Sequence, residues 1–191
     1  MYENQIITEP KWKSWIIQTT TPLFTPEQCR KIIECGRSQP PQQAKVGMGK
    51  PGGGTDTKKR ITTVSWIPFH EMQAMYRDLD KFVQTCNENH FGFGDIRVTE
   101  NAQFTEYPEG GFYDWHMDCD VNMAHEPPVR KISMTLLLND PSEFEGGHLE
   151  LMAPGKFAEL KQGHAIIFAS FLNHRVNPVT RGVRQSLVVW F

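Results

Sequence analysis

The sequence predicts a mainly β domain with flanking α-helices, arranged as a β-sandwich or barrel with the helices packed on one side. Two helical segments come first, and from Ile96 onward the chain changes to short runs rich in β-branched and aromatic residues. The chain has 191 residues, of which 39% are hydrophobic, so it can form one domain with a sizeable core and a second full domain is not expected. We expect residues 1–95 to form an N-terminal helical and lid region, and residues 96–191 to form the β core.

The two helices are predicted from start signals and from the spacing of apolar residues. Thr25-Pro26-Glu27 supplies an N-cap, a proline at the first helical position and an acidic first turn, which predicts an amphipathic helix over 25–37. A second helix is predicted from Phe69 to Glu88. Its apolar stripe is interpreted as a face that packs on the core; the stripe consists of Met72, Met75, Leu79, Phe82, Val83 and Cys86.

The segment from Ser38 to Arg60 is rich in Pro, Gly, Gln and Lys, so it can bury little apolar surface. It is either a disordered connection or a lid over a site, and its length does not decide between the two. Lys58-Lys59-Arg60 at its end is interpreted as a solvated turn, with attraction of an acidic partner as the alternative.

Short strands are predicted through the rest of the chain, because runs of β-branched and aromatic residues are bounded there by Pro and Gly. The expected ranges are 97–107, 111–117, 131–138, 148–151, 164–169, 173–177 and 183–190.

Composition disfavours several classes of protein. The formal net charge is −2, which does not suggest binding to nucleic acid. No stretch approaches the roughly 20 apolar residues that span a bilayer, and the polar segment from Met1 to Lys13 lacks the apolar run of a secretory signal. The scattered cysteines form no C-x-x-C pair, which favours a reduced, cytoplasmic setting; they are Cys29, Cys35, Cys86 and Cys119.

A metal site is indicated by His116-Met117-Asp118, because alternate side chains of a strand share one face. Asp114 lies on the same face, so the pattern alone leaves the identity of the carboxylate ligand open. His174, on a distant predicted strand, would complete a set of two histidines and one carboxylate. Such a facial triad leaves coordination positions open and suits non-haem Fe(II).

A fixed cation is the second requirement, since a dicarboxylate co-substrate has a carboxylate far from the metal. The planar guanidinium of Arg184 suits that task, and Ser186 on the same face could add a hydroxyl donor.

With these motifs in place, residues 60–191 resemble the prolyl-4-hydroxylase-like branch of the Fe(II)- and 2-oxoglutarate-dependent dioxygenases, and within it the PKHD-type hydroxylases. Gln103-Phe104-Thr105-Glu106-Tyr107 and Gly146-Gly147-His148-Leu149-Glu150-Leu151 match motifs of that family. Gly163, Phe168 and Ser170 match its run into the distal histidine. One departure is His148, which stands where relatives commonly have an acidic residue.

The resemblance implies a double-stranded β-helix (a jelly roll) and a role for each site residue. Iron would be bound by His116, Asp118 and His174, and Arg184 would bind the remote carboxylate of 2-oxoglutarate. Tyr107 would donate a hydrogen bond to this co-substrate. Thr135 is expected to replace a tyrosine that some prolyl hydroxylases carry in the strand of Leu136-Leu137-Leu138.

The implied reaction consumes O₂ and 2-oxoglutarate, releases succinate and CO₂, and is supported by ascorbate. The expected substrate is a prolyl residue of a protein or peptide, hydroxylated at C4, with a small molecule or a nucleobase as alternatives. A non-enzymatic jelly-roll metal-binding protein is the alternative of another class, but it would need neither Arg184 nor Tyr107. His125, His148 and Asp120 are candidates for the mouth of the pocket.

Overall fold

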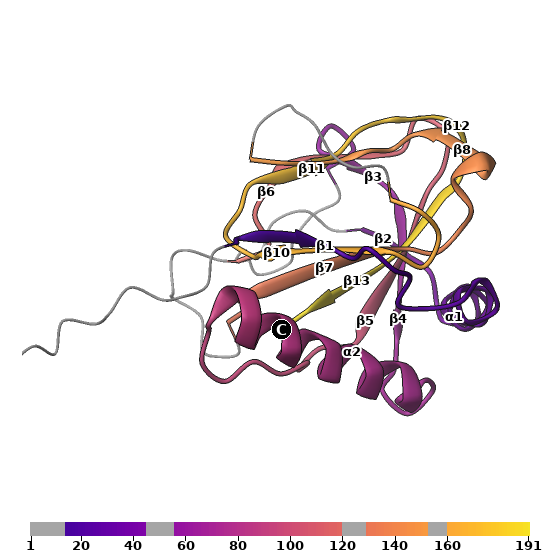
Figure 1. Cartoon of the computed structure of the whole chain (residues 1–191). Coiled ribbons are helices and arrows are strands. Elements are labelled where there is room, and N and C mark those ends of the chain that lie inside the picture. The colour runs from indigo at the N-terminus through magenta and orange to yellow at the C-terminus, as the bar shows by residue number, and fades with distance from the viewer. Residues whose placement is uncertain (1–13, 45–55, 120–128, 153–159) are drawn as a thin grey trace, which may run out of the picture.

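Two antiparallel sheets face each other in the computed structural model, which describes residues 14–44, 56–119, 129–152 and 160–191 (Figure 1). The larger sheet has the strand order β1 (Ile16–Gln18), β10 (Ala165–Ala169), β7 (Ile132–Leu137), β13 (Arg184–Trp190), β5 (Ala102–Tyr107), β4 (Thr63–Ile67), β2 (Gln42–Gln43). The smaller sheet has the order β3 (Arg60–Ile61), β6 (Phe112–His116), β11 (His174–Val176), β9 (Leu149–Leu151). A separate pair joins β12 (Val179–Gly182) to β8 (Phe144–Gly146). All of these pairings are antiparallel, as a jelly roll requires.

The helices cover the larger sheet on the side away from the smaller one (Figure 1). Helix α1 (Pro26–Ser38) begins with a capping box: the Gln28 N–H donates to Thr25 Oγ1 at 3.2 Å, and the Thr25 N–H donates to Gln28 Oε1 at 2.8 Å. Helix α2 (Gln73–Cys86) begins later than predicted and continues into a π-helical turn, η1 (Asn87–Phe91). A 3₁₀ turn, η2 (Pro141–Glu143), precedes β8.

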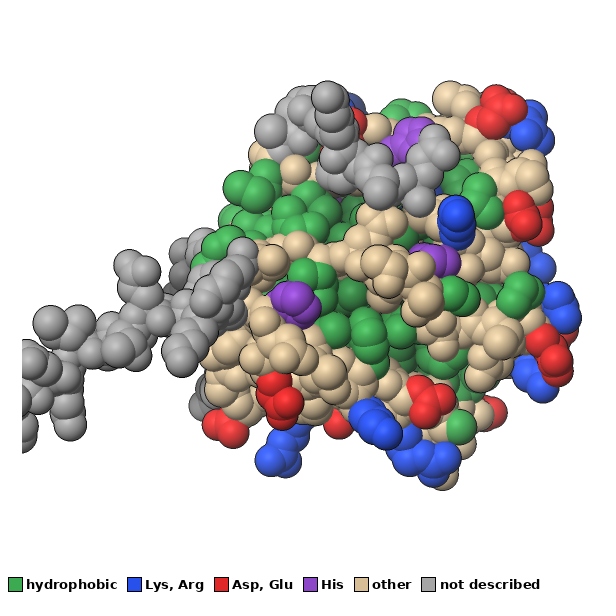
Figure 2. Space-filling model, in the orientation of Figure 1, with side chains coloured by type: hydrophobic (Ala, Val, Ile, Leu, Met, Phe, Trp, Pro, Cys, Tyr) green, Lys and Arg blue, Asp and Glu red, His purple; other side chains and the backbone are tan. Residues whose placement is uncertain are grey.

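The main core lies between α2 and the larger sheet, which confirms the predicted role of the methionine and aromatic stripe. Met75, Leu79 and Val83 of α2 are buried in it. They share this core with buried residues of the sheet, namely Met134, Leu136, Ile167 and Leu187. On the outer surface, acidic and basic side chains intermix along the edge formed by α1 and α2 (Figure 2), as in the Glu27–Lys31 pair of α1. The helices therefore fix one face of the larger sheet and leave its other face for the smaller sheet.

The strands predicted from sequence are present, with bounds shifted by a few residues. Strands β1, β2, β3, β4, β8 and β12 were not predicted. Most of them are short, from two to four residues, so too few residues alternate to give a periodic signal. Strands β1 to β4 show that residues before Ile96 also contribute to both sheets.

Gly36 allows α1 to pack closely on β5, and its replacement by alanine is expected to destabilise the fold. A Cβ at position 36 would lie 2.4 Å from Cγ of Phe104, which is buried. The clash should cost about 1–3 kcal/mol, despite alanine's advantage in helices of up to about 1 kcal/mol. Thermal unfolding measures this as a fall of roughly 2–4 °C per kcal/mol. Gly94→Ala is the matched control, since no heavy atom lies within 4 Å of its added Cβ; equal melting temperatures for the two variants would contradict the packing argument.

Candidate active site

Two adjacent strands of the smaller sheet bring the predicted histidines together. His116 ends β6, His174 begins β11, and the two residues are register partners. The predicted strand over 111–117 ends one residue earlier than expected, at His116. Asp118 therefore lies two residues beyond β6. The Asp118 N–H donates to the carbonyl of Ser170 at 3.0 Å, which turns the carboxylate toward the histidines.

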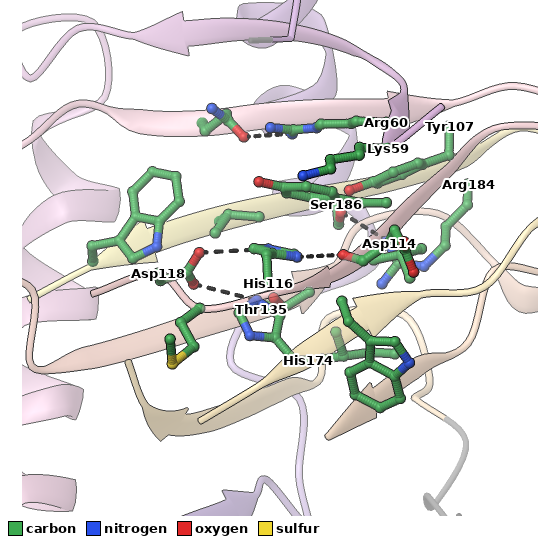
Figure 3. Close-up of a pocket in the computed structure, with 18 of the residues that line it drawn as sticks. Lys59, Arg60, Tyr107, Asp114, His116, Asp118, Thr135, His174, Arg184 and Ser186 are labelled. Carbon is green, nitrogen blue, oxygen red and sulfur yellow. Dashed lines mark hydrogen bonds and ion pairs between the residues drawn. The ribbon is translucent and has the colours of Figure 1, made fainter. Parts of the chain in front are cut away.

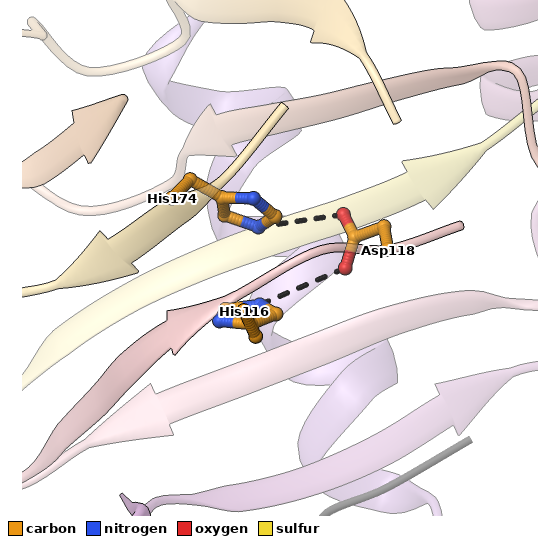
Figure 4. Close-up of side chains that lie close together, drawn as sticks. All are labelled: His116, Asp118 and His174. Carbon is orange, nitrogen blue, oxygen red and sulfur yellow. Dashed lines mark ion pairs between the residues drawn. The ribbon is translucent and has the colours of Figure 1, made fainter. Parts of the chain in front are cut away.

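The three candidate ligands form a compact cluster (Figure 4). Their ligand atoms all lie within 4.8 Å of one another. His116 Nε2 is 3.7 Å from Asp118 Oδ1, and His174 Nε2 is 3.5 Å from Asp118 Oδ2. The side chain of Asp114 is exposed, and it is Asp118 that approaches both imidazoles. The strand pattern left the choice of carboxylate open, and proximity favours Asp118, the residue that the family resemblance implies.

Backbone carbonyls fix the tautomer of both imidazoles. His116 Nδ1 lies 2.8 Å from the carbonyl of Asp114, and His174 Nδ1 lies 3.0 Å from the carbonyl of Leu172. A carbonyl only accepts, so each Nδ1 carries the hydrogen and each Nε2 keeps its lone pair. Burial, together with the nearby His174, lowers the pKa of His116 to about 3. The ring is therefore neutral, which is the form that binds a metal.

The carboxylate of Asp118 is held in its ionised form by its neighbours. Burial opposes ionisation, but His174, His116 and a hydrogen bond from Ser133 together keep the pKa of Asp118 below its usual range. Ser133 Oγ donates to Oδ2 at 2.8 Å and lies 2.9 Å from Ser170 Oγ. Two nitrogens and one ionised carboxylate oxygen are the donor set expected for non-haem Fe(II).

Replacement of Ser133 by alanine is expected to weaken metal binding without removing a ligand. The substitution deletes the hydrogen bond that orients Asp118 Oδ2. Loss of such a supporting contact typically lowers metal affinity by about 10- to 100-fold. Calorimetric titration of the apoprotein with Mn(II) measures the change, and an affinity within twofold of wild type would argue against this role for Ser133. Ser142→Ala is the control, since Ser142 is exposed in η2.

A cavity of about 440 Å³ opens beside the cluster (Figure 3). The structure places seven of the residues predicted from sequence in its walls: His116, Asp118, Thr135, His174, Tyr107, Arg184 and Ser186. They come from β5, β6, β7, β11 and β13 and the turn after β6, so both sheets build the cavity.

Arg184 is buried in this cavity, with 3% of its surface exposed. Its Nη1 donates to Ser186 Oγ at 3.0 Å, and its guanidinium carbon lies 5.7 Å from the centroid of the Tyr107 ring. Among the residues that the structure describes, no carboxylate lies within ion-pair distance of it. Because an unpaired buried cation is costly, this environment is suited to a ligand that carries a carboxylate.

Space for Arg184 depends on the second glycine of the Gly146-Gly147 motif. Gly147 has a φ of +64°, and a Cβ there would lie 2.8 Å from Arg184 Cδ. Ser186 Oγ lies 2.6 Å from Thr105 Oγ1 as well as accepting from Arg184. Ser186 therefore orients Arg184 directly, a contact that the sequence did not specify. Thr135, buried on β7, lies in the wall of the same cavity.

The candidates for the mouth of the pocket and the expected lid lie only partly within the described residues. His148 is exposed and does not line the cavity. Asp120, His125 and much of the expected lid (45–55) lie outside the described residues. Cys29, Cys35 and Cys86 are free thiols, and no helix in the described part of the chain is long and apolar enough to cross a bilayer.

Arg60 is one of the cavity residues that the sequence interpretation missed. The expected solvated turn is wrong for Arg60, which lies half-buried on β3 and lines the cavity. Its guanidinium carbon lies 4.3 Å from the centroid of the Tyr113 ring, and Nη2 donates to Gln103 Oε1 at 3.0 Å. The β-branched run that starts at Ile61 was the available signal that a strand begins here. Arg130 also lines the cavity and forms a bidentate pair with Glu100.

Comparison with known proteins agrees with this geometry. Residues 102–191 match the model of the 2OG-Fe(II) oxygenase superfamily. A PKHD-type hydroxylase of Acidovorax ebreus is 34% identical over 99 residues, which cover 49% of this chain and 44% of the relative. Another from Colwellia psychrerythraea is 43% identical over 84 residues, covering 42% and 37%. The matches thus span less than half the length of these curated relatives.

Solved structures share the fold over almost the whole chain. A Pseudomonas putida prolyl-4-hydroxylase has a TM-score of 0.66 at 21% identity, covering 93% of this chain and 91% of that one. A viral collagen prolyl hydroxylase from Paramecium Bursaria Chlorella virus-1, solved as a 2OG complex, has a TM-score of 0.70 at 17% identity, covering 93% and 95%. A prolyl hydroxylase from Trichoplax adhaerens, in complex with a hypoxia inducible factor peptide fragment, has a TM-score of 0.64 at 16% identity, covering 92% and 82%. The predicted double-stranded β-helix is confirmed.

Proposed function

We propose that this chain is a 2-oxoglutarate- and Fe(II)-dependent oxygenase that hydroxylates a prolyl residue of a protein or peptide. Residues 102–191 match the model of that superfamily, and PKHD-type hydroxylases are among the relatives of the chain. The reaction would convert substrate C–H, 2-oxoglutarate and O₂ into substrate C–OH, succinate and CO₂. The observation that carries this proposal is the presence of the His116–Asp118–His174 cluster and the unpaired, buried Arg184 in one cavity.

The residues present fit an iron ion. Iron would be held by Nε2 of His116, Nε2 of His174 and the carboxylate of Asp118, because these atoms are unprotonated and face one another. Three protein ligands leave positions for a co-substrate and O₂. When bound, Fe(II) supplies the redox chemistry by which O₂ oxidises 2-oxoglutarate and the substrate C–H bond.

The chain's own residues would bind and orient the co-substrate. Arg184 would bind the carboxylate remote from the metal through charge-assisted hydrogen bonds, held in position by Ser186. Tyr107, buried on β5 and opposite Arg184 in register, would donate its phenolic hydrogen to the same end of the molecule. Thr135 would supply a further hydroxyl from β7. The low exposure of these groups would strengthen each contact by excluding water.

The substrate is the less constrained part of the proposal. Prolyl hydroxylation is favoured by the PKHD-type relatives and by the three prolyl hydroxylases of the same fold. A small molecule or a nucleobase would require the same iron and 2-oxoglutarate site, so these stay alternatives for the substrate alone. A non-enzymatic metal-binding jelly roll would have no need for the buried cation of Arg184.

The test is turnover of 2-oxoglutarate by the purified chain with Fe(II) and ascorbate under air. We expect slow succinate formation without substrate and faster formation with a proline-rich peptide that also gains the mass of one oxygen atom. Amino-acid analysis of the hydrolysed peptide would identify 4-hydroxyproline. If the chain neither binds 2-oxoglutarate nor forms succinate, the oxygenase proposal fails; if succinate forms but no prolyl peptide is hydroxylated, only the substrate is wrong.

A further inference from the structure

We propose that Arg60, assisted by Lys59, binds a carboxylate of the primary substrate beside the carbon that is hydroxylated. This inference rests on the proposed function and narrows its substrate class to molecules with an anionic group close to the reacting C–H bond. Lys59 directly precedes β3, and Arg60 is the first residue of β3. Both side chains line the same cavity as the metal cluster.

Arg60 is connected to the metal cluster through one aromatic ring. On β3 it pairs with Tyr113 of β6, and its guanidinium carbon lies 4.3 Å from the centroid of the Tyr113 ring. The Tyr113 ring stacks in turn on the ring of His116, with centroids 3.4 Å apart. Figure 3 shows Arg60 and Lys59 on one side of His116, with His174 on the other. The positive charge of Arg60 therefore lies one ring away from a candidate iron ligand.

The hydrogen-bonding capacity of Arg60 is only partly used. Its Nη2 donates to the neutral amide oxygen of Gln103 at 3.0 Å, while its Nε is buried and has no partner. A buried donor without a partner is unfavourable, and a guanidinium paired only with an amide retains its full charge. A carboxylate would accept a hydrogen bond from the unpartnered Nε of Arg60 and would neutralise the charge of the guanidinium.

The other charges in the cavity wall already have partners or assigned roles. Arg130 is paired with Glu100, Arg184 would be paired with 2-oxoglutarate, and the charge of Asp118 would be used by the metal. The remaining anion, Asp114, is exposed. Within the described parts of the chain, neither its carboxylate nor any other lies within 4.0 Å of Lys59 or Arg60.

Glu106, the neighbour of the cavity residue Tyr107 on β5, is also engaged elsewhere. It forms an ion pair with Arg37 at 2.8 Å and accepts a hydrogen bond from Gln185. With iron and 2-oxoglutarate bound, the side of the cavity formed by Lys59 and Arg60 would therefore remain positive. An anionic substrate is attracted to such a wall, and a cationic one is repelled.

The test compares matched probes that differ in one charge. The protein is loaded with Mn(II) and 2-oxoglutarate without O₂, and the paramagnetic broadening of probe NMR signals reports binding near the metal. The peptide pair is N-acetyl-Glu-Pro-amide and N-acetyl-Gln-Pro-amide; the amino-acid pair is proline and prolinamide. We expect the carboxylate member of at least one pair to bind about tenfold more tightly than its amide partner. The pair that shows the preference tells whether the anion is a peptide side chain or a free amino acid.

Substitutions then assign the preference to Arg60. In Arg60→Gln the two members of the pair should bind within about twofold of each other, whereas Arg60→Lys, which keeps the charge, should retain part of the difference. Arg181→Gln is the matched control, because Arg181 is an exposed arginine paired with Glu145 outside the cavity. A merely structural role of Arg60 would lower the binding of both probes equally and leave their ratio unchanged.

Two outcomes would overturn the inference: equal or undetectable binding of both members of each pair by the wild type, or a preference that survives in Arg60→Gln. Binding of 2-oxoglutarate itself, measured on the same samples, separates this failure from that of the proposed function. If 2-oxoglutarate binds and turns over but the probes do not differ, the charge selectivity alone is wrong.

Discussion

His174→Ala is expected to remove metal binding and 2-oxoglutarate turnover together. His174 is buried at the start of β11, and its Nε2 faces Asp118 at 3.5 Å. Loss of a supporting contact alone costs about 10- to 100-fold in metal affinity, so loss of a direct ligand should cost more than 100-fold. Calorimetric titration of the apoprotein with Mn(II) measures the affinity, and succinate formation with added Fe(II) measures the turnover.

His164→Ala is the matched control for this experiment. His164 is a partly buried histidine whose Nδ1 contacts the Thr19 carbonyl, and it lies outside the cavity. We expect its Mn(II) affinity and its turnover to stay within about twofold of wild type, since neither the ligands nor their supporting contacts change. If His174→Ala binds Mn(II) as tightly as the wild type does, and circular dichroism shows that its fold is intact, the cluster is not the metal site.

The metal cluster could be predicted from sequence because two regular patterns define it. Strand alternation places residues 116 and 118 on one face, and the family motifs pointed to His174 as the distal ligand. The choice between Asp114 and Asp118 depended on the family order of residues, because a strand pattern treats both alike. In the structure β6 ends at His116, and the bond from the Asp118 N–H to Ser170 directs the carboxylate. That bond joins residues 52 positions apart (170 − 118), which no local pattern reveals.

Arg60 shows why other parts of the site could not be predicted. By composition Lys58-Lys59-Arg60 follows a segment rich in Gly and Lys, which is typical of a solvated turn. Arg60 is partly buried because it pairs with Tyr113 on β6 and donates a hydrogen bond to Gln103 on β5. Both contacts are made only in the folded chain. The same holds for Gly147, whose missing side chain leaves room for Arg184 across the fold. Sequence patterns identify the elements that carry side chains, whereas long-range contacts decide which of those side chains lie in the cavity.

Arg184→Gln is the second substitution for which we expect a large effect: it should weaken the binding of 2-oxoglutarate without lowering the stability of the fold. Removing one partner of a buried charge pair typically costs about 2–5 kcal/mol, so the Kd for 2-oxoglutarate should rise by about 30-fold to several thousand-fold. Without co-substrate, Arg184 donates a hydrogen bond to Ser186, and no carboxylate among the described residues pairs with it. Burial lowers the pKa of Arg184. Replacing this unpaired charge by a neutral amide should leave the free energy of unfolding unchanged or raise it.

Thermal unfolding with and without 2-oxoglutarate measures both effects on the same protein loaded with Mn(II). At a concentration 100 times the wild-type Kd, the ligand stabilises the wild type by about 2.7 kcal/mol. In Arg184→Gln this increment should fall to about 0.9 kcal/mol or less, while the melting temperature without ligand does not fall. Arg37→Gln is the control, since it removes an exposed arginine that pairs with Glu106 and should keep the full increment. A variant that retains the increment would show that Arg184 is not the group that binds the co-substrate. A variant that melts earlier without ligand would instead show that Arg184 stabilises the fold, through contacts such as those with Ser186 and the Tyr107 ring.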